Sequence, residues 1–245
     1  MKNILCTLIL LAAISAQAAG KKPVKVFILA GQSNMEGKGK VDPLLNHQIH
    51  APETKKFFAH FHKDGKYIER EDVWINFLNR RGRLTVGFGS PGRIGPELEF
   101  GHVVGDHYEE PVLIIKTAWG GKSIGRDFRP PSSGLPPKEE LDEAVNNMVN
   151  RDYNNLLRNA MNKAKKENPK VTRKDIETQL KVTKEMILKE KGAEFRKQVI
   201  DSQGHFYRLM MEEIAVNLKE LKQRFPDYDG RGYELAGFVW FQGWN

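Results

Sequence analysis

Three short apolar runs, each followed by a turn that contains glycine, dominate the hydrophobic pattern of the chain. They cover residues 24–30, 111–119 and 235–241. Their apolar character is continuous rather than alternating, which is typical of strands buried on both faces, as in parallel sheets. The pattern therefore predicts an α/β fold in which the loops gather at the carboxyl ends of these strands.

A hairpin and a helix are predicted between the first two runs. Residues 73–78 and 84–88 are apolar and flank the polar residues 79–82, which predicts two antiparallel strands joined by a turn. Pro96 precedes the stretch 98–107, and a proline in the first turn favours the start of a helix there. This part of the chain therefore adds one hairpin and one helix to the predicted fold.

The chain between the second and third runs has a strongly helical pattern. One amphipathic helix is predicted around residues 141–153, a second begins at the capping sequence Thr172–Asp175, and the clearest stripe runs from Phe206 to Phe225. Residues 138–224 contain 19 basic and 15 acidic side chains, in a chain whose formal net charge is +8. The mixed signs favour solvated helix faces, and the alternative is a surface that meets acidic polysaccharide or another protein.

The first 20 residues have the pattern of a secretory signal peptide. Lys2 precedes an apolar stretch from Ile4 to Ile14, and the small-x-small sequence Ala16–Ala18 follows. We therefore expect residues 1–19 to be a signal peptide and the protein to be secreted or periplasmic. The one cysteine, Cys6, falls in this segment, so we expect a mature protein without disulfides. No later segment of the sequence predicts a membrane span.

Candidate chemistry lies in the turns that follow the three apolar runs. Ser33 comes after the first run in a sharp turn that Gly31 permits, and its hydroxyl would project above the sheet. Gln242 comes after the third run, and its side-chain amide is a suitable donor to an oxyanion. Gly120 and Gly121 come after the second run and allow a close backbone approach to the same pocket. Each turn alone has an ordinary structural explanation, so only the combination of the three indicates a catalytic site.

Four sequence motifs stand in or near these turns: GQSNM (31–35), GPELEFG (95–101), KTAWGGKSI (116–124) and WFQG (240–243). Together they resemble the sialate O-acetylesterase-like carbohydrate esterases of the SGNH hydrolase superfamily. The resemblance covers residues 24–137 and about 205–245, and it implies a three-layer α/β/α fold with a parallel, flavodoxin-like sheet. In the expected domain, 20–245, residues 138–203 would then be a helical insertion.

The resemblance implies a serine esterase that removes O-acetyl groups from carbohydrates through an acyl-enzyme and uses no cofactor. Ser33 would be the nucleophile, and its backbone N–H, the N–H of Gly120 and the amide of Gln242 would form the oxyanion hole. Three further residues are expected to bind substrate: Asn34, Gly95 and Gly121, of which the two glycines are also alternatives to Gly120. The implied partner is an acetylated polysaccharide or an acetylated sialic acid.

The sequence departs from the family pattern at its carboxyl end. The family's Asp-x-x-His pair, with histidine as base and aspartate orienting it, would follow WFQG, but this sequence ends at Asn245. None of the seven histidines follows an aspartate at that spacing, so no base is assigned. We therefore expect a fragment or a nearly inactive chain, because a triad without its base keeps a rate enhancement of only roughly 10³–10⁴ over the reaction in water. The alternative function is a non-catalytic carbohydrate-binding or scaffold protein on the same fold.

Two other classes of partner are not predicted. The positive net charge does not indicate nucleic acid, because the sequence has no basic helix and no basic patch interleaved with aromatic residues. The pairs His47/His50 and His60/His62 have neither a cysteine nor a tight carboxylate cluster beside them, so no metal site is expected. The sequence does not indicate an oligomeric state.

Overall fold

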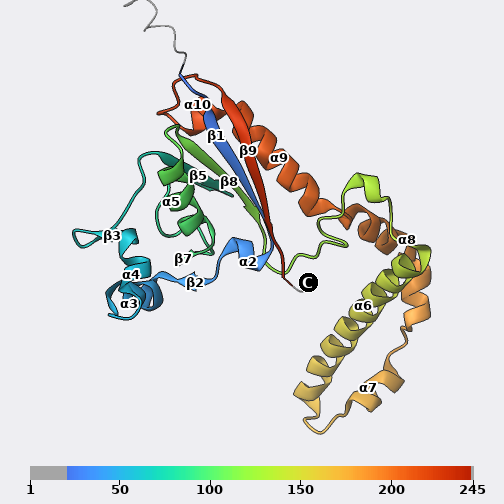
Figure 1. Cartoon of the computed structure of the whole chain (residues 1–245). Coiled ribbons are helices and arrows are strands. Elements are labelled where there is room, and N and C mark those ends of the chain that lie inside the picture. The colour runs from blue at the N-terminus through green and yellow to red at the C-terminus, as the bar shows by residue number, and fades with distance from the viewer. Residues whose placement is uncertain (1–20, 244–245) are drawn as a thin grey trace, which may run out of the picture. The chain divides into compact units, whose positions relative to one another are not determined.

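The computed structural model describes residues 21–243, and Figure 1 shows their helices and strands. The chain divides into two compact units, one made of Met1–Ser123 with Arg208–Asn245 and the other of Ile124–Tyr207. The predicted signal peptide, with Cys6, lies outside the described residues. None of the helices within residues 21–243 is both long and apolar enough to cross a membrane.

A five-stranded sheet forms the centre of the first unit (Figure 1). The strand order is β6-β5-β8-β1-β9, and every neighbouring pair is parallel except β5 with β6. The strands are β1 Val24–Gly31, β5 Val73–Phe77, β6 Arg80–Arg83, β8 Val112–Ala118 and β9 Tyr233–Phe241. Burial along almost the whole of β1, β5 and β8 explains why their sequences are mostly apolar. The prediction of burial on both faces is wrong for the third run, because β9 is an edge strand whose residues are half-buried or exposed. The predicted α/β fold with a mostly parallel sheet is confirmed.

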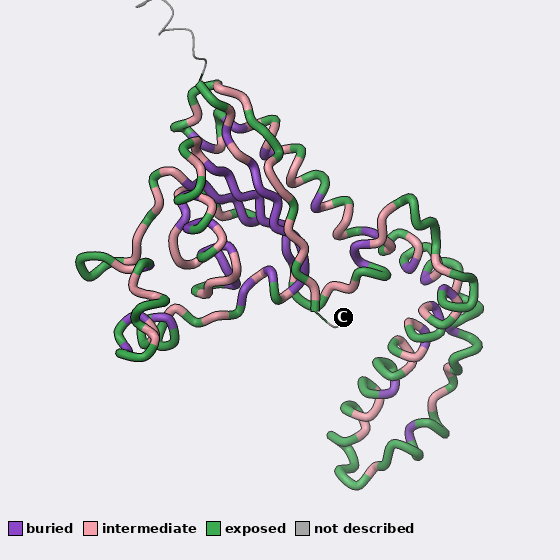
Figure 2. The backbone as a smooth tube through the Cα atoms, viewed as in Figure 1, coloured by how far each residue is buried: buried purple, intermediate pink, exposed green. Residues whose placement is uncertain are grey.

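Helices cover both faces of this sheet, which gives the three expected layers. One face packs against α5 Glu97–His107, where Phe100 contributes to the contact. The opposite face packs against the second half of α9 His205–Lys219, including Leu218, and against α10 Leu221–Arg224. Figure 2 shows that buried residues concentrate in the strands of this sheet.

The predicted hairpin forms, but its second strand is not residues 84–88. The strand is Arg80–Arg83, because the chain reverses within the two residues Leu78 and Asn79. Leu78 has a positive φ of 54°, a conformation that few residues other than glycine and asparagine adopt. This tight turn pairs Phe77 directly with Arg80 and moves the second strand four residues toward the N-terminus.

Two helix boundaries also differ from prediction. Helix α5 begins at Glu97, one residue earlier than expected, with Pro96 as its N-cap residue. The stripe from Phe206 to Phe225 is divided between α9 and α10, because Glu220 leaves the helical region with φ −107° and ψ 25°. The apolar residues on both sides of this break still pack on the sheet.

Short elements that the sequence did not predict fill the connections around the hairpin. They are α2 Ser33–Glu36, β2 Gly39–Lys40, a helical turn at Val41–Leu45, α3 Asn46–His50, α4 Lys55–Phe58, a 3₁₀ turn at Ala59–Phe61, β3 His62–Lys63, β4 Lys66–Tyr67 and β7 Arg93–Ile94. Leu45, Ile49 and Phe61 form a small buried cluster with Leu98 of α5. This cluster anchors the segment to the helix that covers the sheet.

The second unit is helical. Its main helices are α6 Lys138–Glu167 and α8 Lys184–Ser202, with a 3₁₀ turn at Pro131–Ser133 before them and α7 Arg173–Gln179 between them in sequence. Helices α6 and α8 share an apolar core made of Leu141, Val145, Val149, Ile187, Phe195 and Val199. The predicted capping start is confirmed, because the side chains of Thr172 and Asp175 satisfy each other's backbone N–H groups.

Candidate functional site

The carboxyl ends of β1, β8 and β9 meet at one edge of the sheet. The register places Gly31 of β1 beside Ala118 of β8 on one side and beside Phe241 of β9 on the other. The predicted residues follow within two positions of these strand ends: Ser33, Gly120 and Gln242. The parallel register therefore brings the three predicted turns together.

Gly31 allows the turn after β1 to approach β9 closely. Its φ is +152°, and a Cβ built on it would lie 2.1 Å from the carbonyl oxygen of Phe241. The backbone N–H of Gln32 donates to that carbonyl at 3.3 Å, and Nδ2 of Asn34 donates to the carbonyl of Gln242 at 2.8 Å. Only glycine fits at this position, so the turn that carries Ser33 is fixed against the end of β9.

Ser33 is the first residue of α2 and is half-buried. Its Oγ donates to Oε1 of Gln32 at 2.7 Å, and the Gln32 side chain is buried. An amide oxygen accepts a hydrogen bond but is too weak a base to remove the proton. The hydroxyl is therefore oriented at the sheet edge by a neutral partner.

Gly120 lies next to Ser33. A Cβ built on Gly120 would be 3.7 Å from the Cβ of Ser33 and 2.8 Å from a carboxylate oxygen of Glu36. The backbone N–H of Gly120 helps to lower the pKa of this carboxylate. Gly121 has a positive φ of 71°, and a Cβ there would meet nothing within 4 Å. Of the two glycines, Gly120 is thus the one that closely approaches the turn carrying Ser33.

Glu36 belongs to a polar cluster that the sequence analysis did not identify. Its carboxylate accepts a hydrogen bond from the hydroxyl of Ser90 at 2.5 Å and lies 3.0 Å from Nζ of Lys38. Lys38 also donates to the oxygen of Ser90 at 2.6 Å. Partial burial favours the neutral acid, but the hydrogen bonds from Ser90 and Lys38 outweigh it and lower the pKa of Glu36. A carboxylate that is ionised at neutral pH therefore lies beside Gly120.

Gln242 is held at the end of β9 by the loop that follows β8. Its Nε2 donates to the carbonyl of Lys122 at 2.8 Å. The next residue, Gly243, is again tightly enclosed, because a Cβ there would lie 2.4 Å from Nε2 of Gln32 and 2.9 Å from Nδ2 of Asn34. The side-chain amide of Gln242 thus stands at the edge predicted for it, with one hydrogen bond to the neighbouring loop.

A fully buried ion pair lies beneath this edge. Lys116 of β8 contacts Glu97 of α5, and both side chains are 0% exposed. Nζ of Lys116 also donates to the backbone carbonyls of Glu36 at 2.9 Å and Phe88 at 2.8 Å. Burial lowers the pKa of Lys116, and the charge of Glu97 opposes this. The other Glu97 oxygen accepts the N–H of Gly95 at 2.8 Å, so this predicted substrate-binding glycine uses its donor inside the protein.

The described histidines make their contacts elsewhere. His60 has Nε2 2.7 Å from Glu99, and its ring lies 5.5 Å from that of His102. His102 is buried in α5, and burial lowers its pKa. Within residues 21–243, no three His, Cys, Asp or Glu side chains are grouped as metal ligands would be. The only hydrogen bond of the Ser33 hydroxyl within the described residues is the one to Gln32.

Comparison with known proteins gives one family. The family model described as carbohydrate esterase, sialic acid-specific acetylesterase, matches residues 23–176, which include β1, α5 and β8 and end before β9. No curated protein matches the chain. A protein from Arabidopsis thaliana, solved by X-ray crystallography at 1.6 Å resolution, is 18% identical over 42% of this chain and 43% of that chain, with a TM-score of 0.28. This alignment spans less than half the length of either protein.

Proposed function

The chain belongs to the carbohydrate esterase family of sialic acid-specific acetylesterases, and from this premise we propose that it hydrolyses O-acetyl esters of carbohydrates with Ser33 as the nucleophile. The family supports a carbohydrate acetylesterase type of function. The observation that supports the assignment to Ser33 is the register of β1 with β8 and β9, which gathers three motif-bearing turns around its hydroxyl. The acetylated carbohydrate is a polysaccharide or a sialic acid, and no cofactor takes part.

The proposed reaction has two steps. Oγ of Ser33 attacks the acetyl carbonyl carbon, and the electrons of the C=O bond move onto its oxygen. Collapse of this intermediate breaks the bond to the sugar oxygen, which leaves as a hydroxyl with the proton that the Ser33 hydroxyl has lost, and acetyl-serine remains. Water then attacks the acetyl group, acetate departs and the serine hydroxyl is restored. Gln32 orients the hydroxyl, and we assign no residue as the base.

The proposed oxyanion donors are the N–H groups of Ser33 and Gly120 and the side-chain amide of Gln242. A single such donor is typically worth about 10²–10³ in rate. The Glu36 carboxylate lies beside Gly120, and its negative charge would repel the oxyanion. Use of Gly120 therefore requires Glu36 to turn away when the ester binds, whereas Gly95 would have to give up its bond to Glu97.

Substitution of Ser33 tests the proposal. The purified chain is incubated with p-nitrophenyl acetate and with acetylated xylan, and acetate release is compared with that of Ser33→Ala. The matched control is Ser132→Ala, because Ser132 is an exposed serine in the helical unit. We expect Ser33→Ala to release acetate more slowly than the parent chain and Ser132→Ala to equal the parent chain. Full activity in Ser33→Ala would overturn the assignment.

A non-catalytic carbohydrate-binding or scaffold protein is the second candidate. The hydrogen bond from Ser33 to a neutral amide favours it, because an unactivated serine is a weak nucleophile. A fluorophosphonate reagent distinguishes the two functions. Labelling of the peptide that contains Ser33 supports the esterase, whereas an unlabelled chain that still binds acetylated xylan supports the binding protein.

We further propose that the protein acts after export, in the periplasm or outside the cell. The support is the pattern of residues 1–19, which predicts cleavage after Ala18 or Ala19. Mass spectrometry of the exported protein should therefore give a mature N-terminus at Ala19 or Gly20. An exported chain that still begins at Met1 would contradict this.

A further inference from the structure

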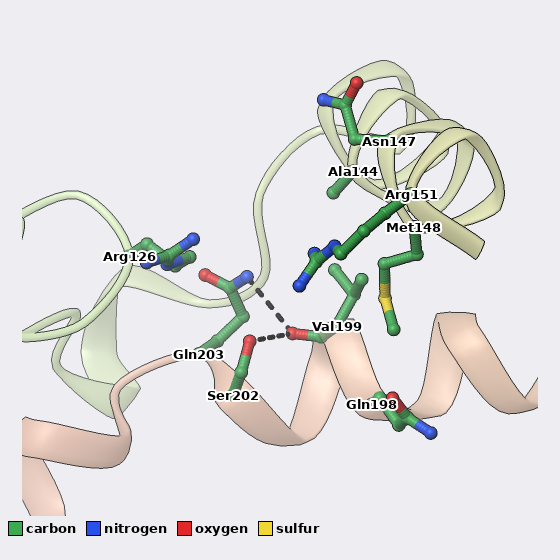
Figure 3. Close-up of a pocket in the computed structure, with 9 residues that line it drawn as sticks. All are labelled: Arg126, Ala144, Asn147, Met148, Arg151, Gln198, Val199, Ser202 and Gln203. Carbon is green, nitrogen blue, oxygen red and sulfur yellow. Dashed lines mark hydrogen bonds between the residues drawn. The ribbon is translucent and has the colours of Figure 1, made fainter. Parts of the chain in front are cut away.

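A cavity of about 350 Å³ lies within the helical unit (Figure 3). Helices α6 and α8 and the segment before α6 line it, and every lining residue belongs to the compact unit Ile124–Tyr207. Two of the lining residues are arginines, Arg126 and Arg151, and none is acidic. The side chains that line the cavity therefore include positive charges and no negative ones, although the surrounding helices carry both signs.

The apolar side of the cavity is part of the packed core between the two helices. Val199 of α8 is buried in this core, and Met148 of α6 packs against it. Ala144, one turn before Met148 on α6, adds a small apolar side chain. Because the α6–α8 core holds these groups, the cavity has a preformed apolar wall.

Arg151 is the arginine available for a ligand. It lies on α6, is exposed, and makes no hydrogen bond or ion pair with any residue in the described part of the chain. Its neighbour Asp152 pairs instead with Lys191 at 2.9 Å. Figure 3 shows the Arg151 side chain extending from α6 toward Ser202 and Gln203 at the end of α8.

The opposite side of the cavity is held in place by hydrogen bonds. The backbone N–H of Gly204 donates to the carbonyl of Arg126 at 2.7 Å, which fixes this arginine to the end of α8. The Arg126 guanidinium lies 3.2 Å from the carboxylate of Asp127. The hydroxyl of Ser202 and Nε2 of Gln203 both donate to the carbonyl of Val199, at 2.7 and 3.2 Å. These bonds set neutral polar groups beside the two guanidinium groups.

We propose that this cavity binds a sugar acid, in the form of a uronate unit of an acidic saccharide. A guanidinium offers two parallel N–H donors that match a carboxylate, and Arg151 has no internal carboxylate to occupy them. The hydroxyl and amides suit the hydroxyls of a sugar ring, and Met148 and Val199 suit its C–H face. The volume lies at the lower end of the range for small-molecule sites, about 300–1,000 Å³. This site shares no residue with the turns around Ser33, and its proposal does not depend on the esterase proposal.

Calorimetric titration of the full chain tests the site. Tri-galacturonate is the probe, galactotriose is its neutral counterpart, and sodium sulfate represents a small anion. We expect tri-galacturonate to bind, galactotriose to give no measurable heat, and sulfate to bind at least about tenfold more weakly. Ser33→Ala should bind tri-galacturonate like the parent chain, which separates this test from that of the esterase.

Variants of Arg151 decide whether the cavity is the site. Arg151→Gln should weaken tri-galacturonate binding about tenfold or more, because it removes a charge-assisted, two-pronged contact. Arg151→Lys keeps the charge but lacks the two parallel N–H donors, so it should lose part of the affinity. This conservative variant also keeps the test valid if Arg151→Gln misfolds. The matched control is Arg158→Gln, since Arg158 is an exposed arginine of α6 that does not line this cavity. Its affinity should stay within about twofold of the parent.

Three results would overturn the proposal. Absence of tri-galacturonate binding would refute it directly. Equal loss in Arg151→Gln and Arg158→Gln would indicate attraction to the general positive charge of α6. Sulfate that binds as tightly as tri-galacturonate, with the same dependence on Arg151, would indicate a site for small anions rather than for a saccharide.

Discussion

Ion pairs of similar geometry stand in opposite surroundings in the two units. In the sheet unit, Lys116 and Glu97 are both fully buried. In the helical unit, Lys197 and Asp201 lie four residues apart on α8 at 2.5 Å, with side chains 76% and 59% exposed. The distance between the charges therefore does not distinguish the pairs. The difference lies in the solvent around each pair and in the other groups that it holds.

The buried pair also organises the backbone around it. Lys116 holds the carbonyls of Glu36 and Phe88, and Glu97 holds the N–H of Gly95, so one pair connects three loops beneath the Ser33 turn. The free energy of removing two charges from water offsets most of the free energy of their attraction. Such a pair therefore contributes little net stability compared with apolar residues in the same place. The pair instead favours one arrangement of the loops. Removal of one partner strongly destabilises the fold, because the other charge then stays buried without a counter-charge.

The largest expected effect follows from breaking the buried pair. Glu97→Gln leaves the ammonium of Lys116 without a counter-charge, and we expect it to lower the free energy of unfolding by about 3–5 kcal/mol. Urea unfolding followed by tryptophan fluorescence measures this, because no tryptophan lies in residues 124–207 and the signal therefore reports the sheet unit. The double variant Glu97→Gln with Lys116→Met should recover a large part of the loss. A double variant no more stable than Glu97→Gln would contradict this account.

The central strands β1 and β8 could be predicted from sequence because burial on both faces leaves long apolar runs. The same rule placed Ser33 and Gln242 together, since parallel strands end at one edge. The run of β9 is also apolar although this edge strand is half-buried or exposed, so its sequence did not reveal its place at the edge. The hairpin register was missed because its turn depends on Leu78 at positive φ, and leucine gives no signal of such a conformation. Helix α8 carries apolar residues too widely mixed with charged ones to mark its ends.

The polar supports of the site were missed for a different reason. Glu36 and Ser90 are 54 residues apart, and no periodicity links them. Lys116 did leave a signal, because it is a lysine inside an otherwise apolar strand. A charged residue there needs a buried partner, and GPELEFG supplies a glutamate. The partnership itself depends on how α5 packs on β8, which only the fold determines.

Loss of a helix cap in the helical unit should have a smaller effect. Thr172→Ala removes the hydroxyl that accepts the N–H of Asp175, and we expect a loss of about 1 kcal/mol in the stability of α7. Hydrogen exchange at the α7 amides measures it, with tryptophan fluorescence unchanged. The control is Thr178→Ala, because Thr178 bonds to the carbonyl of Lys174 within the helix and caps nothing. Equal exchange rates in both variants would argue against the cap.

A partly exposed network should give a still smaller effect that depends on pH. Hydrogen bonding to Arg70 lowers the pKa of Asp72 from the 3.8 of an unperturbed aspartate. The unfolded chain therefore binds the proton first as the pH falls, so the stabilisation is present above pH 3.8 and is lost as the pH drops through the lower folded-state pKa. Because Asp72 is partly exposed, we expect Asp72→Asn to cost roughly 0.5–1 kcal/mol at pH 7 and nothing in strong acid. A cost that does not change with pH would show that packing, not charge, is responsible.

The smallest effect is expected for the exposed pair on α8. Lys197→Ala removes the contact to Asp201, but that side chain is 59% exposed, so no buried charge is stranded. Exposed pairs four residues apart contribute roughly 0.3–0.5 kcal/mol, and alanine's high helix propensity offsets part of that loss. Thermal unfolding followed by far-UV circular dichroism, which is dominated by the long helices α6 and α8, should show a shift near the error of measurement. A loss of stability as large as that expected for Glu97→Gln would mean that the distance between the charges alone determines how much an ion pair stabilises this protein. The proposed difference between buried and exposed pairs would then be wrong.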